Sequence, residues 1–270
     1  MTGARPFSQH DRSSIDTPVF IFGSCQRTGS TLVQRLLNSS DHMVIWGEHD
    51  GYLSELLNGY YRLMAWKKAN SQSVSEFLSK SAQFFMPNTI VGQGEIRQSF
   101  TTHIKGLFPV PPERASAHMW GFKEVRYTAQ VALFLQELFP GASFIHMVRR
   151  AEDCLKSMRQ LERTGMWQKI WTDEALSNWL KINKSFLDVS SQLNRYLLLR
   201  YEDLNGSHAS AHVQRLELFL GLDRGSLDRS ILKNTVDFKL RREIRYSLTE
   251  EERTFLAGAD FKTLNDRYGY

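Results

Sequence analysis

Short apolar runs recur along the chain and are separated by amphipathic segments. Runs of consecutive apolar residues, typical of strands buried on both faces of a parallel sheet, occupy residues 18–22, 43–46, 119–125, 143–148 and 196–199. Apolar residues at helical spacing occupy residues 30–37, 50–86, 129–139, 151–161 and 173–193. Strands that alternate with helices in this way indicate an α/β fold with a mainly parallel sheet.

Three features of the sequence set expected boundaries. Asp173 is a suitable N-cap for the long helix that we expect after it. Residues 87–117 hold four of the seven prolines of the chain, so we expect a loop or lid there. Residues 1–16 are polar and mixed, which is typical of a flexible N-terminal arm. We expect residues 17–270 to form a single domain, with a mainly helical insertion around 50–117.

Composition narrows the class of protein. The chain has 270 residues, a formal charge of +5 and scattered basic residues, a distribution that does not favour a nucleic-acid partner. The two cysteines, Cys25 and Cys154, do not have the spacing of metal ligands, so we expect no metal. The sequence does not decide whether they form a disulfide with each other. No apolar stretch is long enough for a membrane span, and no signal-peptide core is present near Met1, which favours a cytoplasmic location.

The junction between the first strand and the first helix is a candidate anion site. It reads Gly23-Ser-Cys-Gln-Arg-Thr-Gly-Ser-Thr31, and backbone N–H groups at a helix start attract phosphate. The nucleotide-binding pattern G-x-x-x-x-G-K-[ST] fits poorly, because Ser30 stands in place of the lysine and Gly23 comes one residue early. The alternative is an ordinary strand-to-helix turn with a polar cap.

A second candidate anion site follows the fourth strand. Arg149 is expected at the strand tip, and Ser157 lies eight residues on, about two turns into the next helix. An arginine can grip a phosphate bidentately and a serine can add a hydroxyl. Alternatively, Arg149 pairs with Asp153 and Ser157 is solvated. Together the two sites would hold two phosphate groups at neighbouring crevices of the sheet.

These segments resemble the sulfotransferases that use 3′-phosphoadenosine 5′-phosphosulfate (PAPS). Residues 23–31 are similar to the 5′-phosphosulfate loop of the family, and residues 148–157 to its 3′-phosphate motif with the same arginine-to-serine spacing. Arg200-Tyr-Glu-Asp-Leu204 is similar to a recurring segment of the family. The resemblance covers residues 18–48 and 119–221 and implies a P-loop-type three-layer sandwich, with about five mainly parallel strands flanked by helices.

Two further positions extend the resemblance. Glu48 follows Arg27 by 21 residues, the spacing of the proposed base in tyrosylprotein and some bacterial carbohydrate sulfotransferases. Residues 121–127 resemble the third-strand segment whose lysine, here Lys123, reaches the sulfonate. The chain departs from the cytosolic small-molecule branch, which has a lysine in place of Arg27 and a histidine base that Thr102-His-Ile-Lys105 does not reproduce.

The resemblance implies transfer of a sulfonate group from PAPS to a hydroxyl by in-line displacement, with adenosine 3′,5′-bisphosphate as product. The expected catalytic residues are Glu48, Arg27 and Lys123. The expected residues that bind PAPS are Arg27, Thr28, Gly29, Ser30, Thr31, Arg149, Ser157 and Tyr201. Arg241 and Arg242 are candidates to replace the glycine-rich 3′-phosphate segment of the family.

Several alternatives stay open at this point. Glu48 could instead be a surface carboxylate or pair with Arg27, Lys123 could pair with Glu124, and Tyr201 could be a core tyrosine. The rival functions are a P-loop small-molecule kinase and a non-catalytic nucleotide-binding protein on the same fold. The expected partner is a small-molecule hydroxyl acceptor, such as a sugar, a phenol or a lipophilic alcohol. The sequence leaves open whether the protein forms a homo-oligomer.

Overall fold

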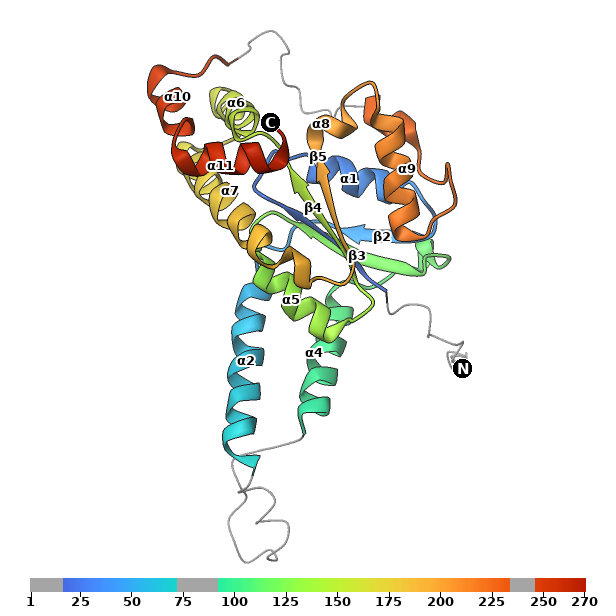
Figure 1. Cartoon of the computed structure of the whole chain (residues 1–270). Helices are drawn as coiled ribbons and strands as arrows, with labels where there is room; N and C mark the ends of the chain where they lie inside the picture. The colour runs from blue at the N-terminus through green and yellow to red at the C-terminus, as the bar shows by residue number, and fades with distance from the viewer. Residues whose placement is uncertain (1–16, 72–91, 234–245) are drawn as a thin grey trace, which may run out of the picture.

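The computed structural model describes residues 17–71, 92–233 and 246–270. Within them, five strands form one parallel sheet (Figure 1). The strands are β1 (Val19–Gly23), β2 (Met43–Trp46), β3 (Met119–Glu124), β4 (Ser143–Val148) and β5 (Tyr196–Arg200). Their order in the sheet is β2-β3-β1-β4-β5. The predicted α/β fold with a parallel sheet of five strands is confirmed.

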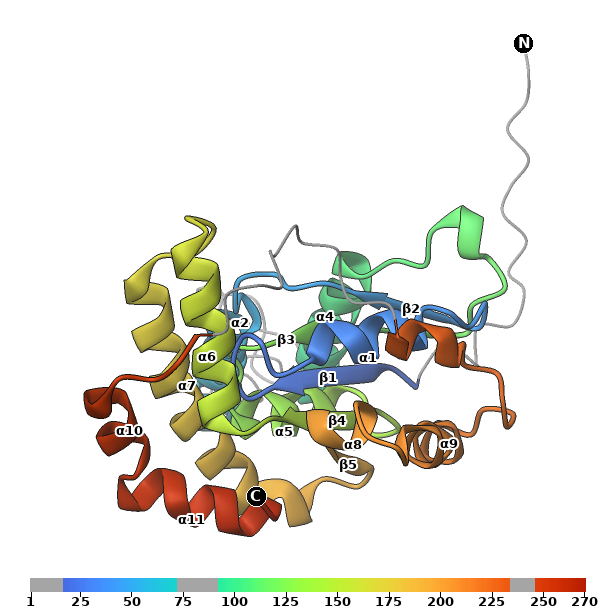
Figure 2. The same cartoon turned by 90° about the horizontal axis from the view of Figure 1, so that it is seen from above.

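Helices pack on both faces of this sheet (Figure 2). They are α1 (Ser30–Leu37), α2 (Leu53–Ala69), α4 (Gln93–Leu107), α5 (Ala129–Leu138), α6 (Ala151–Arg163), α7 (Lys169–Val189), α8 (Tyr201–Leu204), α9 (Ala209–Leu220), α10 (Glu250–Leu256) and α11 (Ala259–Tyr268). The described residues also include the short 3₁₀ helices η2 (Pro112–Arg114), η3 (Ser190–Gln192) and η4 (Arg229–Lys233).

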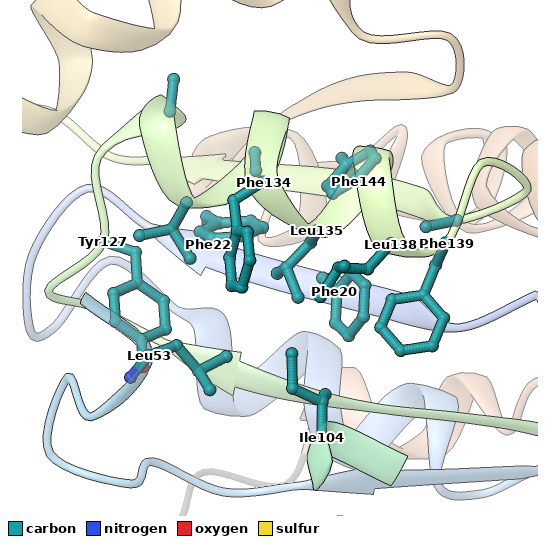
Figure 3. Close-up of a cluster of buried hydrophobic side chains, with 14 of the residues drawn as sticks. Phe20, Phe22, Leu53, Ile104, Tyr127, Phe134, Leu135, Leu138, Phe139 and Phe144 are labelled. Carbon is teal, nitrogen blue, oxygen red and sulfur yellow. The ribbon is translucent and has the colours of Figure 1, made fainter. Parts of the chain in front are cut away.

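The alternation of side chains along the strands divides the core in two. Phe20 and Phe22 of β1 point to one face, where Figure 3 shows them packed with side chains of α2, α4 and α5. Val19 and Ile21 point to the other face, against α1 and α9. A third cluster joins α6, α7 and α11 near the carboxyl end of β4. Because both faces are covered, the ends of the strands are left for binding and chemistry.

Two boundary predictions are wrong. Residues 93–107 form helix α4 instead of a loop or lid, since Ile96 and Ile104 are buried in the core and the nearby prolines lie beyond the helix. Helix α7 begins at Lys169, so Asp173 lies in its second turn instead of capping it. The Thr172 hydroxyl, buried in the first turn, donates to the Glu162 carboxylate and ties that turn to α6.

Two predicted segments lie wholly or partly outside the described residues. The predicted arm, residues 1–16, and the part of the predicted 50–86 helix beyond residue 71 lie outside the described residues. The division into one domain with an insertion stays a prediction. None of the helices in the described ranges is both long and apolar enough to cross a membrane.

Candidate active site

The predicted site residues lie at one edge of the sheet, where the parallel strands end. The anion loop leaves β1 after Gly23, Lys123 is the penultimate residue of β3, and Arg149 follows β4 directly. Tyr201 follows β5, and Glu48 comes two residues after β2. Segments far apart in sequence therefore meet at one edge, as in other open α/β sheets that bind ligands.

The loop between β1 and α1 has the backbone of an anion-binding turn. Arg27 has φ of 68° and Gly29 has φ of 89°, both in the left-handed region. A non-glycine residue there is uncommon and marks local strain. Thr28 donates from Oγ1 to the Cys25 carbonyl over 3.0 Å and closes the turn. Such turns aim successive backbone N–H groups at an anion, here beside the start of α1.

Tyr201 packs directly on this loop. A Cβ atom added to Gly29 would lie 2.4 Å from Cδ2 of Tyr201, so only glycine fits beneath the ring. The guanidinium carbon of Arg149 lies 4.3 Å from the centre of the same ring, a cation–π contact. Tyr201 therefore contacts both predicted anion sites, and its part in binding PAPS stays a prediction.

The two anion sites also share hydrogen bonds. Arg27 donates from Nε to Oγ of Ser157 over 3.0 Å, and Arg149 donates to the Arg27 carbonyl over 2.9 Å. Arg149 thus contacts the loop backbone, in place of the alternative pairing with Asp153. Burial, and then repulsion by the Arg149 guanidinium, lowers the pKa of Arg27. Two cations this close favour an anion between them.

A polar cavity of about 650 Å³ adjoins Arg149 and Ser157. Lys156 and Arg253 also line it, together with residues 246–248 just before α10. Residues 246–248 and Arg253, from the C-terminal region, therefore lie beside the predicted 3′-phosphate site. Arg241 and Arg242, the candidates from the sequence, lie outside the described residues.

Glu48 is held by two cations. The Lys123 ammonium donates to Oε1 of Glu48, and Arg126 donates from a terminal nitrogen to Oε2 over 3.0 Å. The Lys123 side chain is only 8% exposed, whereas that of Glu48 is 32% exposed. The alternative pairings, Glu48 with Arg27 and Lys123 with Glu124, are wrong. Consecutive strand residues point to opposite faces, so Glu124 faces away from Lys123.

Sequence reasoning missed three residues around Glu48. Arg126 contacts Glu48 directly, Glu124 binds Arg126, and the Tyr127 hydroxyl pairs with Nε2 of His49 over 2.6 Å. The sequence did contain a signal for further site residues, because Lys123, Glu124 and Arg126 cluster at the end of an otherwise apolar strand. The sequence alone did not say which of them face Glu48.

The arrangement can bind an anion and accept a proton at one edge of the sheet. Arg27 and Arg149 supply positive charge after β1 and β4, and Lys123 and Arg126 supply it at the end of the neighbouring strand β3. Glu48 is a partly exposed carboxylate next to this charge. Within the described ranges, no group of three histidine, cysteine, aspartate or glutamate side chains gathers so as to hold a metal ion.

Comparison with known proteins adds a family and a fold. Residues 18–225 match the model of the sulfotransferase family. The sulfotransferase domain of the Synechococcus PCC 7002 olefin synthase has 20% identity and a TM-score of 0.55, with 94% of this chain and 95% of that chain covered. Mouse sulfotransferase SULT7A1, complexed with PAP, has 11% identity and a TM-score of 0.48, with 94% and 92% covered. No curated protein sequence matches the chain.

Proposed function

Because the chain belongs to the sulfotransferase family, whose members are enzymes that use PAPS, we propose that it transfers the sulfonate group of PAPS to a hydroxyl acceptor, with Glu48 as general base. The observation that carries this proposal is the contact of Glu48 with Lys123, whose strand β3 pairs with β1, the strand that leads into the anion loop. A base and a cation for the transferred group are thereby adjacent. A small molecule with an alcohol or phenol group is the proposed acceptor.

The reaction balances without a further reactant. The acceptor oxygen attacks the sulfur of PAPS, and the bond from sulfur to the 5′-phosphate oxygen breaks on the opposite side. Adenosine 3′,5′-bisphosphate leaves, and the acceptor proton goes to Glu48. As in phosphoryl transfer, alignment and neutralisation of charge supply most of the catalysis.

The anion loop and Arg149 are proposed to bind the two ends of the nucleotide. The backbone and hydroxyls of residues 28–31 would hold the 5′-phosphate, with Arg27 at the bridging oxygen and sulfonate. Arg149 and Ser157 would hold the 3′-phosphate. The hydrogen bond from Arg27 to Ser157 supports a shared role, since this guanidinium lies between the two groups of residues.

Lys123 is proposed to serve both reaction partners. Its ammonium has three N–H donors, and one of them reaches Glu48. The others would be available to the sulfonate as negative charge develops on the leaving group. Arg126 also binds Glu48, so the carboxylate would stay anchored while Lys123 turns to the sulfonate. Cationic side chains placed in this way stabilise a transition state that gains negative charge.

The first test is binding followed by transfer. Calorimetric titration with adenosine 3′,5′-bisphosphate should show binding, while ATP with magnesium should not bind. Labelled PAPS is then offered with 4-nitrophenol, glucose or 1-decanol, and the sulfated product is measured. Binding without transfer would instead favour a nucleotide-binding protein, and binding of ATP with magnesium would favour a kinase.

Glu48→Gln tests the base. A general base contributes about 10²–10⁴-fold, so transfer should fall by about that factor while binding of adenosine 3′,5′-bisphosphate persists. Glu113→Gln is the matched control, because it makes the same change at an exposed carboxylate in η2, just before the amino end of β3. Equal transfer by wild type and Glu48→Gln would exclude the role of Glu48.

A further inference from the structure

Glu124 is a fully buried carboxylate at the end of β3, and each of its two oxygens accepts two hydrogen bonds. Its Oε1 accepts from the backbone N–H of Val125 and from Arg126, each over 2.8 Å. Its Oε2 accepts from the backbone N–H of His49 over 3.1 Å and of Gly51 over 3.0 Å. A buried charge is stable only with such partners. Burial alone would raise the pKa of Glu124, but these N–H groups and Arg126 outweigh it and lower the pKa.

Two of these bonds hold the backbone that carries Glu48. His49 follows Glu48 directly, and Gly51 comes two residues later. Between them Asp50 has φ of 58°, a left-handed conformation that is uncommon for residues other than glycine, so contacts from other segments help to hold the turn. The Glu124 carboxylate supplies that support from β3, because one oxygen binds both N–H groups of the turn.

Glu124 also places the second cation on Glu48. One terminal nitrogen of Arg126 donates to Oε1 of Glu124 over 2.8 Å and to Oε2 of Glu48 over 3.0 Å. The buried carboxylate of Glu124 thus holds the Arg126 guanidinium, which in turn orients the partly exposed carboxylate of Glu48. Glu124 acts on Glu48 by two routes, through the backbone of the turn and through Arg126.

We infer that Glu124 is a positioning residue for the reaction, which orients Glu48 toward the acceptor oxygen. The inference rests on the proposed role of Glu48. Catalytic geometry is sensitive to displacement, and a shift of about 1 Å can cost about 10²-fold in rate. Glu124 itself is buried on the face of the sheet that packs against α2, α4 and α5, and it exchanges no proton with the acceptor.

The chain contains a matched control for the purely structural contribution of such a group. Glu217 on α9 is buried, accepts from the backbone N–H groups of Gly225 and Leu227, and pairs with Arg229. Its chemistry is that of Glu124, but it braces the segment after α9 instead of the turn at Glu48. Any loss of stability that comes only from breaking the hydrogen bonds of a buried carboxylate should therefore appear when either Glu124 or Glu217 is changed.

The experiment compares Glu124→Gln with Glu217→Gln in the full-length chain. The amide of glutamine has a single acceptor oxygen and brings an NH₂ group against N–H donors. In Glu124→Gln, hydrogen exchange of the amides in residues 46–52 should become faster, and kcat with PAPS and 4-nitrophenol should fall by about 10–100-fold. If another acceptor of the panel is the one that reacts, it replaces 4-nitrophenol. Calorimetric binding of adenosine 3′,5′-bisphosphate should stay at the wild-type value.

The control separates the outcomes. Glu217→Gln should lower thermal stability to a similar degree and leave kcat at the wild-type value. Equal kcat in the two variants, or wild-type kcat in Glu124→Gln despite faster exchange, overturns the inference while Glu48 keeps its role. If wild type transfers sulfonate to no acceptor, the proposed function fails first and the inference with it. Should Glu124→Gln not fold, Arg126→Gln replaces it, and wild-type kcat there overturns the inference.

Discussion

Arg27 donates a hydrogen bond from Nε to Oγ of Ser157 over 3.0 Å, although 130 residues separate them in the chain. The contact joins the loop after β1 to helix α6, so the two expected phosphate sites are one connected structure. Arg149 strengthens the link, because it donates to the Arg27 carbonyl and lies over the Tyr201 ring. A change in one of these residues should therefore alter both expected phosphate sites.

Arg149→Ala should weaken binding of adenosine 3′,5′-bisphosphate. Loss of one partner from a buried, hydrogen-bonded charge pair costs roughly 2–5 kcal/mol, which is about 30-fold or more in the dissociation constant. Calorimetry at constant ionic strength measures the effect. Arg224→Ala, at an exposed position, is the control for loss of one positive charge. Similar dissociation constants for both variants would contradict the assignment of Arg149.

Gly29→Ala should destabilise the protein, because the new methyl group meets the Tyr201 ring and alanine is strained at φ of 89°. The left-handed conformation alone costs about 1–2 kcal/mol, to which the clash adds. Urea unfolding measures the loss. Gly59→Ala is the opposite case, since nothing lies within 4 Å of its new Cβ in helix α2, and it should stabilise by about 1 kcal/mol.

A double variant separates the two causes at Gly29. Adding Tyr201→Ala removes the ring, so the clash disappears and the backbone strain remains. The combined loss of stability should then be smaller than the sum of the single losses. Strict additivity would show that the ring does not press on this position.

Tyr127→Phe should cost about 1–3 kcal/mol of unfolding free energy, because it leaves buried polar groups without a partner. The hydroxyl accepts from the Leu53 N–H over 2.8 Å and pairs with Nε2 of His49 over 2.6 Å. Thermal or urea unfolding reports the change. Tyr52→Phe also removes a hydroxyl, but one that is exposed and bonded to His103, and it should change stability little. Equal effects would argue against the Tyr127 contacts.

Stability should fall as the pH is lowered, in part because of His146. Burial lowers the pKa of His146 from 6.5 to about 3. The unfolded chain binds this proton near pH 6.5 and the folded chain only near pH 3. Between these values the unfolded state holds more protons, so unfolding free energy drops by up to about 1.4 kcal/mol per pH unit.

His146→Leu should remove this part of the slope. The difference between wild type and variant is measured by urea unfolding from pH 7 to pH 5, so that other groups cancel. His208→Leu, at an exposed position, should leave the slope as in wild type. Parallel curves for wild type and His146→Leu would mean that His146 titrates normally in the folded protein.

The sequence by itself determined the strands, most of the helices and the loop at Arg27. These features rest on local patterns, since apolar runs specify buried strands and a polar, glycine-containing junction specifies the turn. It also determined which residues stand at strand ends, and so which lie at the binding edge. It failed for residues 93–107, where the burial of Ile96 and Ile104 outweighs the composition of the neighbouring segment.

Only the tertiary structure decided which of the charged residues meet. Glu48 pairs with Lys123 and Arg126 because β2 and β3 are neighbours in the sheet, an order that no local pattern states. Glu124 follows Lys123 in sequence yet faces the opposite side, because side chains alternate along a strand. An ion pair forms only where two opposite charges come within about 4 Å. Strand order and the direction of each side chain decide this, and the packing of the whole chain sets both.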